Sequence, residues 1–258
     1  MSFKIIDFHC HPFLCDDERI GGYVNLVNLS TEEFFNHMSF CGVSICSGSV
    51  IGKKTNRFED LHNFNLHALK LREKYPDRYI PGFHIHPDFV EESIKEVDFA
   101  IENGVKLIGE LVPYHHGWQD YSSTGFMKIL DYINSKKLIV SMHIGEVAEI
   151  EQLEKAIALY KDTTFVLAHP GYGERIEKHI EILQKYPNAY LDLSGSGIDL
   201  FGTVKKLTES TDYKKILFGS DFPVTTPGAW ISAVMGENIT DDAKRHILGI
   251  NAERIFTV

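Results

Sequence analysis

The feature that most constrains the fold is a regular alternation of short apolar segments with amphipathic segments, repeated eight times along the chain. The apolar segments are typical of parallel β-strands that are covered on both faces, and the amphipathic ones are typical of surface helices. Strands are predicted to start near residues 3, 43, 79, 105, 138, 164, 189 and 215. Eight such units in 258 residues favour a closed (β/α)8 TIM barrel, which takes roughly 250 residues, over an open sheet. We therefore expect one domain over residues 1–258.

Local signals refine several helix starts. Ser30 and Glu33 have the spacing of a capping box, which predicts a helix that begins there. Asp88, with Glu91 three residues on, is predicted to cap a later helix in the same way. Residues 114–120 are polar and aromatic and are predicted to form a loop. Five histidines in helical segments are expected at the surface: His37, His62, His67, His179 and His246.

Composition narrows the function. A formal charge of −10 argues against a broad surface for nucleic acid or anionic membrane, which leaves a small-molecule substrate. The four cysteines form no C-x-x-C pair and suggest no disulfide framework, which predicts a reducing, cytoplasmic location. We expect neither a signal peptide nor a membrane span, because no apolar run has the required length.

Six ionisable side chains stand at the carboxyl ends of five predicted strands or just after them. Barrel enzymes carry their chemistry at that end, so these side chains are expected to meet at one mouth. Each alone has an ordinary explanation, such as a hydrogen-bonded histidine or a turn aspartate. Six together favour a metal site, because buried charge is costly unless it is paired or metal-bound. The candidate ligands are His9, His11, Glu110, His143, His169 and Asp221.

These motifs, as a set and in order, resemble the amidohydrolase superfamily. The likeness is greatest to its amidohydrolase-related branch, which includes the aminocarboxymuconate-semialdehyde decarboxylases. The resemblance spans the whole chain and rests on residues 6–11, 109–110, 142–143, 167–171, 218–223 and 251–256.

The resemblance implies a role for each residue. His9 and His11 would hold a divalent ion, with Asp221 as a further ligand and acid/base group. His143 would be a ligand, and His169 would be either a ligand of a second ion or a general acid/base.

Glu110 bears on the number of ions. Two-metal relatives carry a bridging carboxylate or carboxylated lysine on the fourth strand, and the one-metal decarboxylases do not use that position in this way. The resemblance therefore favours hydrolysis with one or two ions. Nitrogen and oxygen ligands without cysteine suit zinc, manganese, iron or nickel, and zinc is the default.

The resulting hypothesis is a metal-dependent hydrolase that uses an activated water on a small amide, lactone or ester. Asp221 would accept the proton of the water and pass it to the leaving group. Weaker candidates for substrate contacts follow the third, fourth and sixth strands: His84, His86, His115, Trp118 and Tyr172.

Three other functions stay open. The first is a non-oxidative decarboxylase of an aromatic or muconate-like acid, although the strand ends offer few arginines for a carboxylate. The second is a phosphoesterase or nuclease, and the third is a non-catalytic metal-binding barrel. A homodimer is expected by analogy with such barrels.

Overall fold

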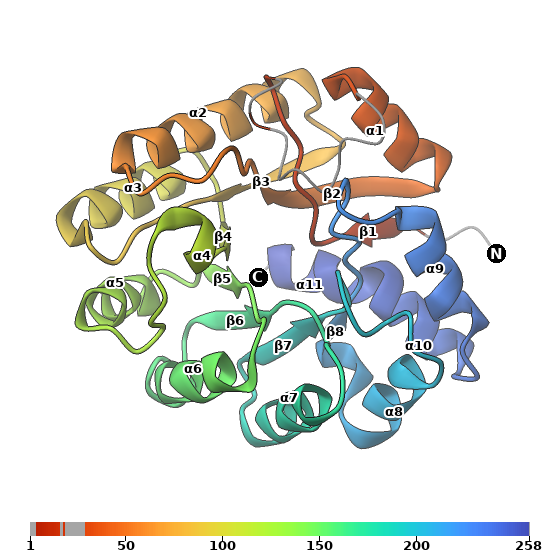
Figure 1. Ribbon diagram of the computed structural model, residues 1–258. Coiled ribbons are helices and arrows are strands. Elements are labelled where there is room, and N and C mark those ends of the chain that lie inside the picture. The colour runs from red at the N-terminus through yellow and green to blue at the C-terminus, as the bar shows by residue number, and fades with distance from the viewer. Residues whose placement is uncertain (1–3, 16–17, 19–28, 258) are drawn as a thin grey trace.

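The computed structural model describes residues 4–15, 18 and 29–257, and within them eight parallel strands pair in sequence order (Figure 1). This confirms the predicted (β/α)8 TIM barrel. The strands are β1 (Ile5–Asp7), β2 (Val43–Ser49), β3 (Tyr79–Phe83), β4 (Leu107–Leu111), β5 (Ile139–Met142), β6 (Thr164–Leu167), β7 (Ala189–Asp192) and β8 (Ile216–Leu217).

The barrel closes through the segments that follow β1 and β8. Phe8 N donates to Phe218 O at 2.8 Å, and Asp221 N donates to His9 O at 2.7 Å. A parallel bridge between Cys10 and Phe222 continues the pairing. Two segments that carry predicted metal ligands are thereby hydrogen-bonded neighbours, although more than 200 residues separate them.

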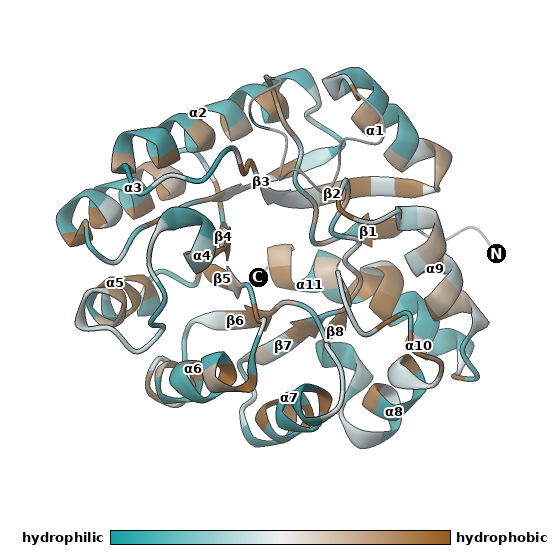
Figure 2. Ribbon diagram, viewed as in Figure 1, coloured by the Kyte–Doolittle hydropathy of each residue, from teal (hydrophilic) through white to brown (hydrophobic). Residues whose placement is uncertain are grey.

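Helices surround the strands, and most of them mix hydrophilic and hydrophobic residues along their length (Figure 2). They are α1 (Thr31–Phe40), α2 (Phe58–Lys74), α3 (Val90–Glu102), α4 (Pro113–His116), α5 (Thr124–Asn134), α6 (Val147–Leu159), α7 (Glu174–Lys185), α8 (Thr203–Ser210), α9 (Pro227–Gly236), α10 (Asp241–Arg245) and α11 (Asn251–Thr257). A 3-10 turn, η2 (Tyr213–Lys215), precedes β8, and a π-helical turn, η3 (His246–Ile250), joins α10 to α11.

The start of the barrel is filled by apolar side chains. Leu107 and Ile139, at the first positions of β4 and β5, are buried with Ile6 in one cluster that also contains Ala252 and Ile255 of α11. Phe256 of α11 stacks on Phe8 with ring centroids 5.5 Å apart. Because α11 occupies this end, the opposite end, where the strands finish, is left for chemistry.

The helix starts were predicted with mixed success. The capping box at Ser30 is confirmed, since Ser30 Oγ accepts from Glu33 N and Glu33 Oε2 accepts from Ser30 N at 2.8 Å. The predicted cap at Asp88 is wrong: α3 starts at Val90, and its N-cap Phe89 offers no side-chain hydrogen bond.

Two short helices were not predicted. The expected loop over residues 114–120 begins inside α4, where Pro113 stands at the first helical turn. Helix α9 follows β8, and only Pro227 and Val234 of it are buried. Its apolar residues are not gathered on one face, so the periodicity that marks an amphipathic helix is absent.

No helix among the described residues is both long and apolar enough to cross a membrane.

His179 is buried, although it was expected at the surface. It lies in α7 with 1% of its surface exposed, and its ring hydrogen-bonds to the backbone of His169. Burial, followed by the charge on Arg175, lowers the pKa of His179 from 6.5 to about 3. The folded protein therefore holds this ring neutral while the unfolded chain protonates it below pH 6.5.

This difference predicts a pH dependence of stability. The contribution of His179 is fully present above pH 6.5 and is lost as the pH falls toward 3, because protons then bind only the unfolded chain. Between pH 7 and pH 5 the loss should be about 2 kcal/mol from this group. Urea unfolding of the wild type and of His179→Gln at both pH values measures it. Between pH 7 and pH 5, the free energy of unfolding of the variant should fall by about 2 kcal/mol less than that of the wild type. Equal losses in both proteins would show that His179 does not cause this pH dependence.

Candidate metal centre

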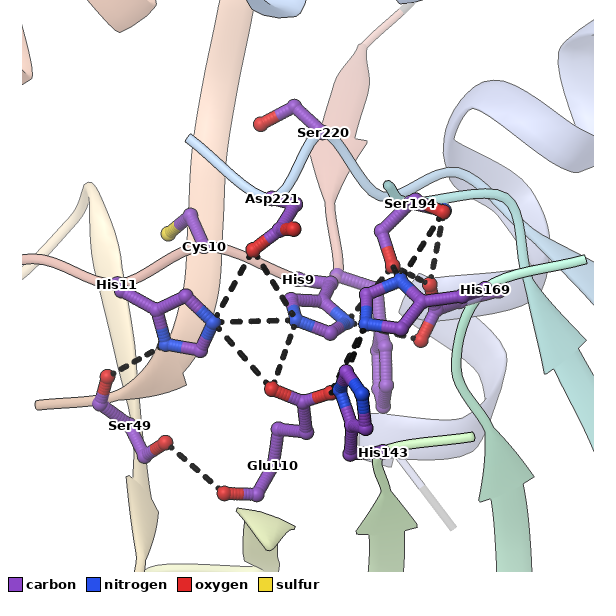
Figure 3. Close-up of polar contacts among 12 residues, drawn as sticks. His9, Cys10, His11, Ser49, Glu110, His143, His169, Ser194, Ser220 and Asp221 are labelled. Atoms are coloured by element: carbon purple, nitrogen blue, oxygen red, sulfur yellow. Dashed lines mark hydrogen bonds and ion pairs between the residues drawn. The ribbon is translucent and has the colours of Figure 1, made fainter. Parts of the chain in front are cut away.

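All six predicted ligands meet at the mouth formed by the strand ends (Figure 3). Glu110 lies in β4, and the other five follow the strands β1, β5, β6 and β8. Within the set, the side chains of His9 and His11 are only 1% and 2% exposed, while those of Asp221 and His143 are 12% and 19% exposed. Solvent reaches the cluster at His143 and Asp221.

The Glu110 carboxylate lies at the middle of the cluster and divides it. Its Oε2 lies 3.3 Å from His9 Nε2 and 3.4 Å from His11 Nε2. Its Oε1 lies 3.2 Å from His143 Nδ1 and 3.2 Å from His169 Nε2. Each carboxylate oxygen therefore faces its own pair of imidazoles, as Figure 3 shows.

Asp221 adds a second carboxylate to one of the two pairs. Its Oδ1 lies 3.3 Å from His11 Nε2 and 3.8 Å from His9 Nε2. The ligand atoms of His9, His11 and Asp221 lie within 4.8 Å of one another, as do those of His9, Glu110 and His169. Both groups have the composition and spacing to hold a metal ion.

Hydrogen bonds orient three of the imidazoles. Ser49 O lies 3.1 Å from His11 Nδ1, and Ser194 O lies 3.1 Å from His169 Nδ1. A carbonyl oxygen only accepts, so each of these Nδ1 atoms carries the proton and each neutral ring keeps its lone pair at Nε2. His9 has the same arrangement, with Asp192 Oδ2 at 3.1 Å from its Nδ1.

These lone pairs point at a carboxylate, which is unfavourable unless a cation or a proton lies between them. Metal-binding histidines in proteins are held in this way, with the other ring nitrogen bonded to a carboxylate or carbonyl. The donors present therefore fit a divalent metal ion. The low solvent exposure of His9, His11 and Glu110 also favours one, because buried charge is stabilised by a counter-charge.

Protons take the place of a cation when none is bound. Burial opposes a charge on His11, but hydrogen bonds with Asp221 and Glu110 outweigh burial and raise its pKa to about 9. Burial likewise opposes a charge on His9, while Glu110 and Asp192 hold its pKa well above the usual range. Burial works against the charge on Glu110 too, and the surrounding histidines keep its pKa well below 4.5. A metal ion that bound here would therefore have to displace these protons.

Asp192 was not predicted as part of the centre, and the Ser194 hydroxyl links it to two of the histidines. Ser194 Oγ lies 2.9 Å from His9 Nδ1 and 3.0 Å from His169 Nδ1, and it also donates to Asp192 Oδ1. One hydroxyl thus contacts one imidazole from each side of Glu110. The available signal was an acidic residue at the last position of β7, since Asp192 ends an otherwise apolar strand.

The backbone is held in place around the ligands. Asp7 Oδ1 accepts from His9 N at 3.1 Å and from Ser220 N at 2.9 Å, which fixes β1 against the segment after β8. His169 and Asp221 have positive φ values of 69° and 61°. Residues with side chains rarely adopt this conformation, and where they do, it is often at functional sites.

The residues predicted to contact substrate occupy different environments. His84 and His86 are buried, with ring nitrogens 2.8 Å from Val50 O and from His116 O respectively. His115 is also buried, and Trp118 packs on Tyr121 and Phe126. Tyr172 is half exposed and donates to Asp199 at 2.9 Å. Contact with substrate stays a prediction for all five.

Tyr114 was not predicted and lies at the open side of the centre. It is half exposed, and its ring meets that of His143 edge to face with centroids 5.1 Å apart. The Lys54 ammonium lies 5.6 Å from the centre of the Tyr114 ring. An aromatic surface and a cation therefore lie next to the most exposed imidazole of the cluster.

Sequence comparison identifies the family. A family model described as amidohydrolase matches residues 6–258, so this chain belongs to the amidohydrolase family and is an enzyme of that metal-dependent family. No curated protein matches the chain in sequence.

Solved structures share the fold over whole chains. An uncharacterized TIM-barrel protein from Bordetella bronchiseptica has a TM-score of 0.78 at 20% identity, covering 99% of both chains. A probable 2-pyrone-4,6-dicarboxylic acid hydrolase from Acinetobacter baumannii has a TM-score of 0.71 at 16% identity, covering 99% of this chain and 100% of its own. A 5-carboxyvanillate decarboxylase from Novosphingobium aromaticivorans, with bound manganese, has a TM-score of 0.70 at 13% identity, covering 100% and 98%. The same fold thus serves both hydrolases and decarboxylases.

Proposed function

We propose that this enzyme is a hydrolase of small amides, lactones or esters, with two divalent metal ions bridged by Glu110. The observation that carries the proposal is the division of the Glu110 carboxylate between two sets of donors. If Glu110 held only one ion, its second oxygen would have no metal to bind, although it also faces two imidazoles.

The residues divide into two ligand sets. His9, His11 and Asp221 would hold one ion with Glu110 Oε2, and His143 and His169 would hold the other with Glu110 Oε1. Nitrogen and oxygen donors of this kind suit zinc first, and manganese, iron or nickel also. The manganese in the decarboxylase of the same fold supports a broad choice of metal.

A metal ion bound here would lower the pKa of a water molecule toward about 7 and polarise the substrate carbonyl. Asp221 is the more exposed of the two carboxylates, and its position at the open side lets it accept the proton of the attacking water. The same side chain then donates this proton to the leaving nitrogen or oxygen. His169 is the second acid/base candidate in the event that only one ion binds.

Decarboxylation is the second candidate, and the solved decarboxylases of this fold favour it. A decarboxylase needs a cation beside the centre to hold the carboxylate of its substrate. Arg175 is already engaged, since its guanidinium donates to Ile144 O, Gly145 O and Ser196 Oγ. Lys54 beside Tyr114 is the residue that could serve this alternative.

A substrate panel separates the two candidates. The metal-loaded wild type should open lactones or cleave amides or esters, with acid release and without carbon dioxide. Release of carbon dioxide from aromatic or muconate-like acids, with no hydrolysis of any panel member, would contradict the proposal.

Asp221→Asn tests the proton transfer within the same assay. Asparagine keeps an oxygen for the metal but cannot accept a proton, so the variant should retain most of its metal and lose about 100-fold or more in turnover. Metal content by elemental analysis and turnover on the best substrate measure the two effects. Near-normal turnover would exclude Asp221 as the acid/base group.

Ser194→Ala tests the orientation of the histidines. Loss of the hydroxyl shared by His9 and His169 should weaken metal affinity by about 10- to 100-fold. Ser196→Ala is the matched control, because the Ser196 hydroxyl contacts Arg175. Competition with a chromophoric chelator measures both variants, and equal affinities would show that Ser194 does not position the ligands.

A further inference from the structure

A second group of metal-binding side chains lies apart from the six-residue centre. Cys15 and Glu18 belong to the segment after β1, and His67 belongs to α2, about fifty residues further along the chain. Their ligand atoms lie within 4.8 Å of one another. None of the three takes part in the contacts around Glu110.

The local backbone brings Cys15 and Glu18 together and aims the carboxylate. Glu18 N donates to Cys15 O at 3.1 Å. Glu18 Oε2 accepts from Leu14 N at 2.9 Å and from Cys15 N at 3.1 Å. The other oxygen, Oε1, contacts His67 Nδ1. The carboxylate is thus fixed by two backbone donors and presents its remaining oxygen to the imidazole.

Burial and access also suit a bound ion. Glu18 is only 4% exposed, whereas Cys15 is exposed and the His67 side chain is 24% exposed. The buried carboxylate supplies negative charge. Because Cys15 is exposed to solvent and His67 is partly exposed, an ion can reach the group from outside.

We propose that Cys15, Glu18 and His67 form a second metal site, which binds Zn²⁺ through sulfur, oxygen and nitrogen. Thiolate, imidazole and carboxylate are the ligands that zinc takes in proteins. Three protein donors leave one tetrahedral position for water, so the site is open rather than closed. The thiolate distinguishes it from the six-residue centre, which has only nitrogen and oxygen donors.

The proposed second site lies on the chain segment that follows His11, a ligand of the main centre. Cys15 comes four residues after His11, and the intervening Phe13 is buried. An ion on Cys15 and His67 joins the segment that leaves His11 to α2. Zinc at this site therefore secures the backbone that carries two ligands of the main centre.

Cobalt(II) chloride is the probe, because cobalt replaces zinc and gives a near-ultraviolet charge-transfer band only when a thiolate binds it. The full-length wild type, kept reduced with a phosphine, should develop this band on titration. Cys15→Ser should abolish it. Cys41→Ser is the matched control and should retain the band, because Cys41 also neighbours a histidine, His37, but among the described residues no carboxylate completes that pair.

His67→Gln should weaken cobalt binding, followed by the same band, by about tenfold or more. The proposal is overturned when the wild type gives no thiolate band, when the band survives in Cys15→Ser, or when His67→Gln leaves the affinity unchanged. The band reports the sulfur ligand alone, so this test is independent of the activity and metal content of the main centre.

Discussion

The contact on which the active end of the barrel depends is that between the Glu110 carboxylate and four imidazoles. A carboxylate with 4% exposure is costly unless cations or strong donors surround it. Here each of its oxygens lies within 3.4 Å of two ring nitrogens, and those nitrogens come from three different strand ends. The charge of Glu110 in β4 therefore requires hydrogen-bond donors or cations from the segments after β1, β5 and β6.

A surrounding set of side chains makes this arrangement persist. Asp7 holds the backbone of His9 against the segment after β8, and Asp192 and Ser194 hold the rings of His9 and His169 from behind. These groups are buried, and each is hydrogen-bonded to the backbone or ring that it holds, so the ring orientations are set before any ligand arrives. The same preorganisation makes the lone pairs converge, so a cation or protons must lie between them.

The six-residue centre was predictable from the sequence because the fold is parallel and closed. When every strand runs in one direction, the last residue of each apolar segment must reach the same mouth, as Glu110 and His143 do. Asp192 also ends such a segment, but its position in the sequence does not show whether it holds a ligand or is an ordinary strand residue. The sequence pattern could not reveal the burial of His179 or the helix α9. His179 is buried and hydrogen-bonds to the backbone of His169, and α9 has no periodic apolar face.

Metal content per chain tests the central claim most directly, measured by elemental analysis in a Cys15→Ser background so that the proposed second site does not contribute. The bridged centre predicts about two ions, and about one after Glu110→Gln. Glu96→Gln is the matched control and should retain two, because Glu96 is a buried glutamate that contacts a histidine, His62, on the helical layer. One ion per chain that Glu110→Gln leaves unchanged, or no ion even after reconstitution, would contradict the account.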